Sequence, residues 1–364
     1  MQRLQAWSKR SMPPRKKTSA LPNSISYPAR LSLAHLPTPI TKLERYSSRF
    51  DNVDIWVKRD ELTGLEVSGN KIRKLEFSLA EAQSQGCDTL ITCGGLQSNH
   101  CRATAIIGAR LGFKVHLILR GEKPEVPDGN LLMDYLCGAE ISFLPAGRWS
   151  EHVDFASQLK ARYRSLGRKG LFIPTGASDA TGLWGYIAAT EELIADFSSL
   201  EMTPDYIICA TGSGGTQAGL IVGSKIFGYN GQILSFNVSD DPEYFDHKVR
   251  QDVEDWKRSY SELLAGTAGE QIIPSALEVI THGGYLGPGY GSCDKEVFET
   301  IHEVAVSEGL FLDPVYTGKA FHGMVAELNK GSEGALADAE NVLFVHTGGL
   351  FGLFPQQSGF AFSG

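Results

Sequence analysis

Short apolar runs that alternate with helix-like segments constrain the fold of this chain more than any other feature. Strands are predicted at residues 53–58, 89–93, 114–119, 140–144, 171–174, 206–211, 233–238 and 341–346, of which 53–58 is expected to be half-buried and 89–93 and 206–211 buried. Between and after them, helical periodicity predicts helices near residues 71–85, 101–111, 130–136, 151–166, 183–197, 216–227, 243–264 and 294–307. This order predicts an α/β fold whose parallel sheets are covered by helices on both faces.

Composition narrows the class of protein. The chain has 364 residues, which is enough for two domains, and a net charge of −8, which does not favour nucleic acid as a partner. No apolar run approaches the length of a membrane span. The six cysteines are scattered without CxxC spacing, so we expect reduced thiols and neither a disulfide framework nor a metal site.

The N-terminal segment differs from the rest of the chain. Residues 1–43 are rich in lysine, arginine and serine, and the first acidic residue is Glu44. Such acid-free, basic N-termini are typical of organellar transit peptides. The alternative is a basic tail with no targeting role. We assign residues 1–32 to this segment.

Lys71 follows a short turn, Ser68-Gly69-Asn70, at the start of a predicted helix. Asn70 is a candidate N-cap, and Arg73 and Lys74 crowd further positive charge into the first turn. Cations are disfavoured at this end of a helix, and their proximity lowers the pKa of a lysine, as Schiff-base chemistry requires. The alternative is a solvated basic helix start.

Two strand-to-helix loops carry glycines and polar side chains. The first, Gly94–His100, offers backbone N–H groups to a carboxylate or phosphate, although Ser98 or Asn99 could also simply cap the helix. The second, Gly212-Ser213-Gly214-Gly215-Thr216, is suited to one phosphate, because it lacks both the P-loop lysine and the full dinucleotide spacing. A plain tight turn is the alternative.

Five strings in order, SGNKIRKLEF, GGLQSNHCRATA, GSGGTQAG, LDPVYTGKA and FVHTGGL, resemble the D-cysteine desulfhydrase and 1-aminocyclopropane-1-carboxylate (ACC) deaminase family. This family belongs to the tryptophan-synthase-like, fold type II pyridoxal-phosphate enzymes, and the resemblance covers roughly residues 33–354. Its plant mitochondrial members look most similar, which favours the transit-peptide interpretation. The resemblance implies a homodimer. It also implies a large domain (33–76 and 190–364), a small domain (77–189) and pyridoxal phosphate in the cleft between them.

The resemblance also implies roles for individual residues. Lys71 would bind pyridoxal phosphate as a Schiff base, Asn99 would lie near the cofactor's 3-hydroxyl, and the loop from Thr211 to Thr216 would hold its phosphate. The substrate carboxylate would face Gln97, Ser98 and the amides of their loop. Nearest the reacting carbon atoms would be Ser98, Tyr290 and Tyr316. His100 would be a site residue or only a helix-start residue.

Two threonines bear on the substrate. Deaminases of the family resemble this chain but carry Glu in place of Thr317 and Leu in place of Thr347. A threonine hydroxyl, most simply that of Thr347, can bond the pyridine nitrogen without supplying a countercharge. The weaker electron sink favours β-elimination of D-cysteine over opening of a cyclopropane. ACC deamination, elimination from D-serine, β-chloro-D-alanine or L-cysteine, and catalytically silent cofactor binding remain alternatives.

Overall fold

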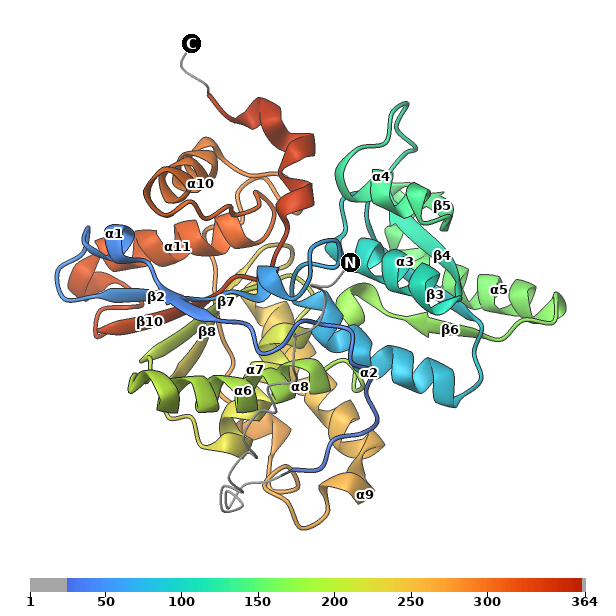
Figure 1. Cartoon of the computed structure of the whole chain (residues 1–364), viewed down its shortest axis with the longest axis horizontal. Helices are drawn as coiled ribbons and strands as arrows, with labels where there is room; N and C mark the ends of the chain where they lie inside the picture. Colours follow the sequence, from blue (N-terminus) through green and yellow to red (C-terminus); the bar gives the residue numbers. More distant parts are fainter. Residues whose placement is uncertain (1–24, 362–364) are drawn as a thin grey trace, which may run out of the picture.

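Two sheets organise residues 25–361, which are the residues that the computed structural model of this protein describes (Figure 1). The larger sheet has the strand order β1-β2-β10-β7-β8-β9, and the smaller has the order β5-β4-β3-β6. All neighbouring strands are parallel except β1 and β2. The predicted α/β fold with mostly parallel sheets is confirmed. The strands are β1 (Ile40–Lys42), β2 (Asp54–Lys58), β3 (Thr89–Gly95), β4 (Lys114–Arg120), β5 (Glu140–Leu144), β6 (Gly170–Ile173), β7 (Tyr206–Thr211), β8 (Gln232–Asn237), β9 (Ile280–His282) and β10 (Asn341–Val345).

Alternating side chains of the larger sheet pack into two separate hydrophobic cores, one on each face. In β7, Ile207 and Cys209 pack with α6, α7 and α8, whereas Ile208 and Ala210 pack with α10 and α11 on the other face. A parallel strand that is buried on both faces explains why this run reads as continuously apolar. The helices are α1 (Glu44–Ser47), α2 (Lys71–Ser84), α3 (Asn99–Leu111), α4 (Gly129–Leu136), α5 (His152–Ser165), α6 (Trp184–Leu200), α7 (Gly215–Phe227), α8 (Pro242–Ser259), α9 (Ser261–Leu264), α10 (Lys295–Glu308) and α11 (Thr317–Asn329).

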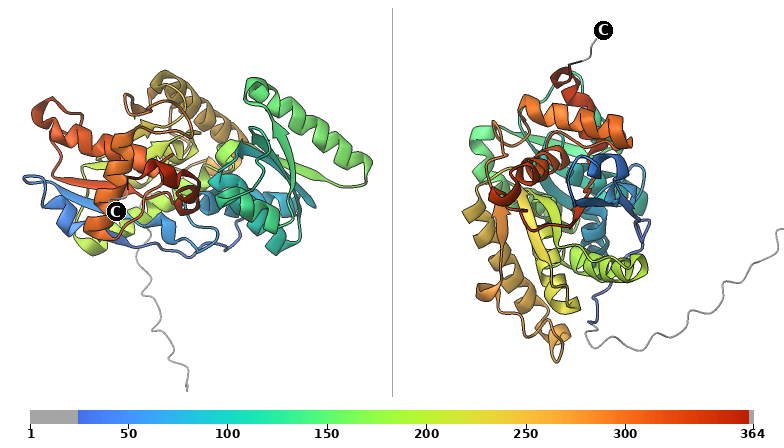
Figure 2. Two further views of the ribbon diagram at one scale, coloured as in Figure 1. Left: turned by 90° about the horizontal axis from the view of Figure 1, so that it is seen from above. Right: turned by 90° about the vertical axis from the view of Figure 1, so that its left-hand side faces the viewer.

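The smaller sheet is covered in the same way. Its strand β3 sends Leu90 to a core shared with α2, α3 and α4, and Ile91 to a core shared with α5. The left-hand view of Figure 2 shows the two sheets with their helices as neighbouring lobes, and in the right-hand view the larger lobe lies in front of the smaller. Within residues 25–361, no helix is long and apolar enough to cross a bilayer.

Helix α2 belongs to both lobes. Its Phe77 packs in the core below the larger sheet, while Leu75 and Leu79 pack in the core of the smaller one. The predicted domain limits at residues 77 and 190 therefore fall inside α2 and α6 and not in loops. The helix expected at 243–264 is also divided, because α8 ends before Tyr260 and α9 begins after it.

Packed structure begins before residue 33, where we expected the folded part to start. The ring of Tyr27 lies edge-on to Trp184 at 5.7 Å, and the Leu31 amide donates to the Glu76 carbonyl at 3.0 Å. Of the predicted basic segment 1–32, residues 1–24 lie outside the described residues. Residues 25–32 contact α2 and α6, so they form part of the fold.

Candidate active site

A cavity of about 700 Å³ lies where the carboxyl ends of β3, β7 and β10 meet. Ligands of parallel α/β folds bind at such strand ends, because the loops that follow carry free backbone groups. The cavity brings together these predicted site residues: Lys71, Ser98, Asn99, Thr211, Gly212, Ser213, Gly214, Thr216, Tyr290, Tyr316 and Thr347. His100 also lines it, whereas Gln97, Gly215 and Thr317 do not.

Lys71 is the first residue of α2 and is held by the turn before it. Gly69 has a φ of +110°, and a Cβ there would lie 2.4 Å from the Thr347 carbonyl oxygen, so only glycine fits. The Asn70 amide donates to that same oxygen at 3.2 Å. Burial lowers the pKa of Lys71 to about 8, although Asp313 opposes the shift. A lysine with this pKa is partly neutral near pH 7 and can act as a nucleophile or base.

The side chain of Asn70 does not cap α2, contrary to our expectation. It donates instead to Thr216 Oγ1 at 2.9 Å, on the glycine loop that follows β7. This bond joins the lysine turn to the second glycine loop, 146 residues further along the chain.

That second loop is shaped to approach an anion closely. Gly214 has a φ of +82°, and α7 begins directly after it at Gly215. A Cβ on Gly215 would lie 2.6 Å from Ser178 Oγ and 2.8 Å from Lys74 Nζ. Ser178 Oγ in turn accepts from the Gly215 amide at 3.1 Å and lies 2.8 Å from Ser213 Oγ. Backbone amides, hydroxyls and a cation thus converge here, as phosphate binding requires.

Ser178 lines the cavity and Lys74 lies directly behind it, and the sequence analysis identified neither as a site residue. Lys74 is fully buried, and its Nζ lies 3.2 Å from the Gly176 carbonyl oxygen and 3.3 Å from Ser178 Oγ. Burial and the charge of Lys71 hold the pKa of Lys74 well below its usual value. Lys71 and Lys74 are three residues apart, which places them on one face of α2. This spacing in the sequence could have identified Lys74.

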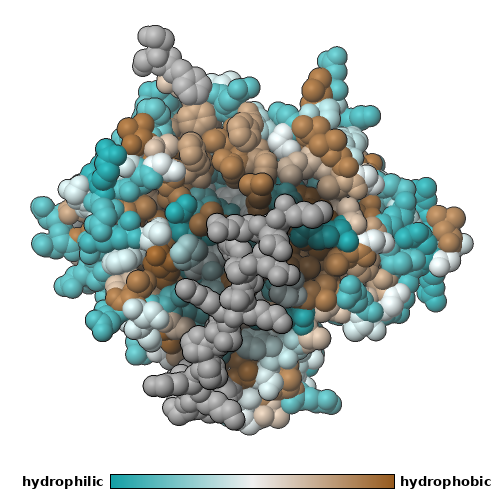
Figure 3. All heavy atoms as spheres, viewed as in Figure 1, coloured by the Kyte–Doolittle hydropathy of each residue, from teal (hydrophilic) through white to brown (hydrophobic). Residues whose placement is uncertain are grey.

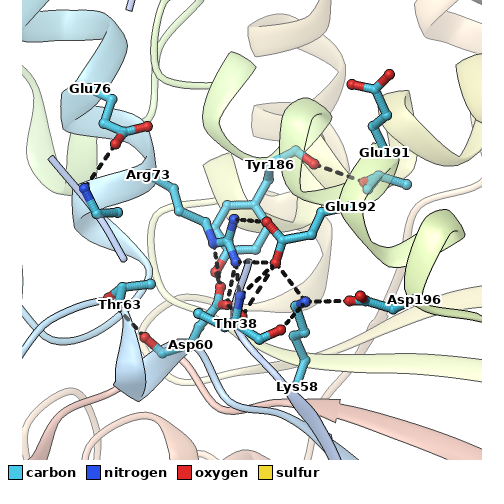
Figure 4. A network of polar contacts seen from close by, with 12 residues as sticks. Thr38, Lys58, Asp60, Thr63, Arg73, Glu76, Tyr186, Glu191, Glu192 and Asp196 are labelled. Atoms are coloured by element: carbon cyan, nitrogen blue, oxygen red, sulfur yellow. Dashed lines mark hydrogen bonds and ion pairs between the residues drawn. The ribbon is translucent and has the colours of Figure 1, made fainter. Parts of the chain in front are cut away.

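Arg73, the other cation after Lys71, does not line the cavity and lies in a buried polar network (Figure 4). It forms paired hydrogen bonds to the carboxylates of Asp60 and Glu192 at 2.7–3.0 Å. Asp60 is fully buried and also accepts from Tyr186 at 2.6 Å. The Arg73 charge is therefore neutralised locally, and this residue anchors α2.

The loop after β3 presents Ser98 and Asn99 to the cavity. Ser98 caps α3 by accepting from the Cys101 amide at 3.2 Å, as one of our alternatives predicted. Gln97 turns away: its amide nitrogen donates to Asp128, and its Oε1 accepts from the Asn130 amide at 2.8 Å. The Gln97 side chain thus supports α4 and does not face the space where a substrate would bind.

His100 is buried and neutral. The Thr92 hydroxyl donates its one proton to the Ile173 carbonyl, so the His100 Nε2–H must donate to Thr92 Oγ1, at 2.7 Å. His100 Nδ1 is then an unprotonated acceptor, and it has no partner among the described residues. Burial and the nearby Lys71 hold the pKa of His100 well below its usual value.

Tyr290 and Tyr316 form a pair at the cavity wall. Their hydroxyl oxygens lie 2.6 Å apart. A Cβ at Gly95 would lie 3.1 Å from the Tyr290 ring, and one at Gly212 would lie 3.3 Å from the Tyr316 ring, so each tyrosine packs on one glycine loop. Burial raises the pKa of both tyrosines, which keeps both hydroxyls protonated at neutral pH.

The two threonines that we considered for substrate choice occupy different environments. Thr347 lines the cavity at the end of β10. Thr317 is fully buried, and its hydroxyl donates to Asp313 Oδ1 at 2.7 Å and accepts from the Asp313 amide at 2.8 Å. Only Thr347 is therefore free to contact a ligand.

These features fit pyridoxal phosphate. The cavity offers a lysine whose pKa burial lowers, and a glycine loop backed by Lys74 for one phosphate. Among residues 25–361, no cluster of three or more His, Cys, Asp or Glu side chains could hold a metal ion.

Comparison with known proteins agrees with this geometry. Residues 31–348 match the model of the family described as "Pyridoxal-phosphate dependent enzyme". A provisionally named ACC deaminase of Thermotoga maritima is 43% identical over 331 residues, covering 90% of this chain and 98% of that protein. The "Bifunctional D-cysteine desulfhydrase/1-aminocyclopropane-1-carboxylate deaminase, mitochondrial" of Arabidopsis thaliana is 39% identical, covering 89% of this chain and 79% of that protein.

Solved structures show the same fold. The crystal structure of an ACC deaminase homologue superposes with a TM-score of 0.80 at 34% identity, covering 91% of this chain and 95% of that one. Both prokaryotic and plant proteins are similar to this chain, so the similarity does not single out the plant mitochondrial type. The chain belongs to the pyridoxal-phosphate dependent enzymes of fold type II, among the relatives of ACC deaminase and D-cysteine desulfhydrase, and pyridoxal phosphate is its cofactor.

Proposed function

We propose that this protein is a D-cysteine desulfhydrase, which converts D-cysteine and water to pyruvate, hydrogen sulfide and ammonia. The observation that carries the proposal is the charge of the cavity lining. Among the described residues that line it, the one carboxylate is that of Asp240, which is solvent-exposed, and Thr347 offers a hydroxyl. A lining without a buried carboxylate supplies no countercharge to a pyridine nitrogen, which favours elimination of a good leaving group.

Lys71 is the base in this proposal. With a pKa of about 8, roughly one molecule in ten carries a neutral amine at pH 7 once the lysine is released from the cofactor. Bound pyridoxal phosphate supplies the electron sink that makes the α-proton acidic. Tyr290 and Tyr316 hold their protons at neutral pH, so they suit donation to the departing sulfur better than removal of the α-proton.

The start of α3 is the proposed site for the substrate carboxylate. Ser98 lies at the N-cap, where the backbone amides and the helix dipole favour negative charge. The side chain of Gln97 is left out of this role, because its amide is bonded to Asp128 and Asn130.

ACC deamination is the second candidate. The provisional name of the Thermotoga relative and the bifunctional name of the Arabidopsis relative favour it. Both reactions would use Lys71 and the same carboxylate site, so the chemistry at the ring nitrogen separates them.

The experiment that tests the proposal measures sulfide and pyruvate released from D- and L-cysteine, with ammonia released from ACC in parallel. We expect equal amounts of sulfide and pyruvate from D-cysteine. The Lys71→Ala variant should lose both turnover and the yellow absorbance of bound cofactor, while Lys225→Ala, on α7 and outside the cavity, should keep both. Turnover of ACC without sulfide release from D-cysteine would overturn the proposal.

We also propose a homodimer. Leu62, Leu65, Phe311 and Leu350 line one shallow groove, and Leu65 and Phe311 are 81% and 52% exposed. Figure 3 shows apolar side chains gathered on the face seen in Figure 1. Large exposed apolar patches are typical of protein interfaces. Light scattering should give twice the chain mass, and Leu65→Asp should halve it; a monomeric parent protein would contradict the proposal.

Import into mitochondria is a further proposal, supported by the acid-free basic segment and by the name of the Arabidopsis relative. Residues 1–32 fused to a fluorescent protein should direct it to mitochondria. A uniform cytosolic signal would contradict the proposal.

A further inference from the structure

Arg102 is a buried cation whose hydrogen-bond partners are all neutral. It lies on α3 and is completely buried. Its guanidinium donates to Asn99 Oδ1 at 3.2 Å, to Asn130 Oδ1 at 2.8 Å and to the Ser68 carbonyl at 2.6 Å. The ring of Phe351 covers the guanidinium, with its centroid 4.9 Å away.

No carboxylate neutralises this charge within the described residues. Arg102 forms no ion pair there, and the nearest acidic influence is Asp134, whose two oxygens have no hydrogen-bond partner. Burial raises the pKa of Asp134 well above its usual value, which favours the neutral form of this group. Burial lowers the pKa of Arg102 to about 10, and the arginine is still charged at pH 7. A buried, uncompensated cation is costly and therefore needs a reason.

The three oxygens that Arg102 contacts connect it to the site. Ser68 lies in the turn that carries Lys71, and Asn99 lines the cavity. Asn130 also donates to Asn99 Oδ1, at 3.1 Å, so the Asn99 oxygen accepts two hydrogen bonds. A guanidinium can only donate, which identifies the bonded Asn99 atom as oxygen and leaves its NH₂ group to face other partners. The positive charge behind that oxygen polarises the amide and makes the NH₂ group a stronger donor.

We propose that Arg102 is a positioning residue that acts through Asn99: it strengthens the hydrogen bond from Asn99 to an anionic oxygen of bound pyridoxal phosphate and fixes the Lys71 turn relative to it. The cofactor then supplies the negative countercharge that Arg102 does not find among its protein neighbours. This inference rests on cofactor binding alone, so it stands or fails independently of whether D-cysteine is the substrate.

A double-mutant cycle between Arg102→Lys and Asn99→Ala tests the proposal. The measured quantity is the dissociation constant of pyridoxal phosphate, obtained by titrating cofactor-free protein and following the absorbance of bound cofactor. Lysine keeps the positive charge but lacks the planar fork that holds the Asn99, Asn130 and Ser68 oxygens, so Arg102→Lys alone should weaken binding by about 10-fold. In the Asn99→Ala background, the same change should have an effect of less than about 2-fold, because the amide that transmits it is gone.

Arg110→Lys is the matched control, since Arg110 is an exposed residue of the same helix, paired with Glu66 at the surface. It should leave the dissociation constant unchanged. An equal loss of affinity from Arg102→Lys with and without Asn99 would overturn the proposal, because Arg102 would then be acting only on the fold.

A second variant, Asn130→Asp, keeps Arg102 and gives it a carboxylate partner, and it also removes the hydrogen bond from Asn130 to Asn99 Oδ1. Both changes reduce the polarisation of the Asn99 amide, so cofactor binding should weaken in the same Asn99-dependent way. If neither Arg102→Lys nor Asn130→Asp folds, as judged by circular dichroism, the proposal is also overturned, because the network would then be required for folding and not for the site.

Discussion

Arg73 and Arg102 occupy equivalent depths of the molecule but opposite electrostatic environments. Arg73 is 2% exposed and bonded to two carboxylates, whereas Arg102 is 0% exposed and bonded only to amide and carbonyl oxygens. Accordingly, the surroundings of Arg73 outweigh the effect of burial and hold its pKa well above the usual value, while burial lowers that of Arg102 to about 10. Protein carboxylates neutralise the charge of Arg73, whereas in our proposal the countercharge for Arg102 comes from a bound ligand.

This difference separates two ways of holding Lys71, the proposed catalytic lysine. The Arg73 network fixes the helix that carries Lys71, and the Arg102 contacts fix the turn before it relative to the Asn99 loop. We expect loss of the first to affect folding, and loss of the second to affect cofactor binding.

The largest effect should come from Arg73→Met. The change leaves the Asp60 carboxylate buried without its paired cation, which costs about 3–5 kcal/mol of unfolding free energy. Urea denaturation of the holoprotein measures it. Arg110→Met, which breaks an exposed pair, should cost less than about 1 kcal/mol. Equal losses in the two variants would show that the buried network contributes nothing special.

Arg102→Met should have a smaller effect on stability. It leaves the Asn130 and Ser68 oxygens without the Arg102 donor, while Asn99 Oδ1 keeps its hydrogen bond from Asn130 and no carboxylate is left bare, so we expect a loss of about 1–3 kcal/mol. Its affinity for pyridoxal phosphate should fall more than that of Arg73→Met. The same denaturation and titration experiments compare the two variants, and the reverse order of affinities would contradict the distinction drawn between these arginines.

The smallest predicted effect is the pH dependence of stability that comes from Asp60, near Arg73, and from Asp134, near Arg102. The two dependences have opposite signs. Burial alone would raise the pKa of Asp60, but Arg73 outweighs it and lowers the pKa, so the stability from this group is lost as the pH falls below about 4. Asp134 has a raised pKa, so its contribution to stability declines as the pH rises above about 4.

The Asp134→Asn variant removes the decline of stability with rising pH that Asp134 causes. Relative to the parent protein it should become more stable as the pH rises from 4 to 8. This gain in unfolding free energy should be smaller than the loss in either arginine variant. For Asp60→Asn, the loss of stability relative to the parent protein should instead be largest at pH 4 and above, and it should shrink as the pH falls below 4. Urea denaturation at pH 8, pH 4 and pH 3 checks both variants. Parallel curves for Asp134→Asn and its parent would mean that Asp134 is not buried in its neutral form.

What the sequence predicted correctly is local. Strand β7 and the glycine loop after it lie next to each other in the chain, and both are readable from apolar residues and glycines. Unfavourable charge at the start of its helix drew attention to Lys71, and the structure places this residue in the cavity, while its chemical role stays a prediction.

What the sequence could not show depends on partners far apart in the chain. Asn70 looks like a helix cap until Thr216 is placed beside it, and Gln97 looks like a substrate contact until α4 is packed against it. Thr317 looked available until Asp313 was seen to bond its hydroxyl on both sides. Side-chain orientation at such positions is decided by tertiary packing, which no local pattern encodes.

The most direct test of the central claim, that a cavity with a threonine and no buried carboxylate favours elimination from D-cysteine, is a comparison of specificity. The measurement is the ratio of kcat/KM for D-cysteine to that for ACC, in the parent protein and in Thr347→Leu. We predict a ratio above one in the parent protein, which falls by several-fold to about 10-fold when the hydroxyl is removed. A ratio below one, or a ratio that Thr347→Leu leaves unchanged, would contradict the account.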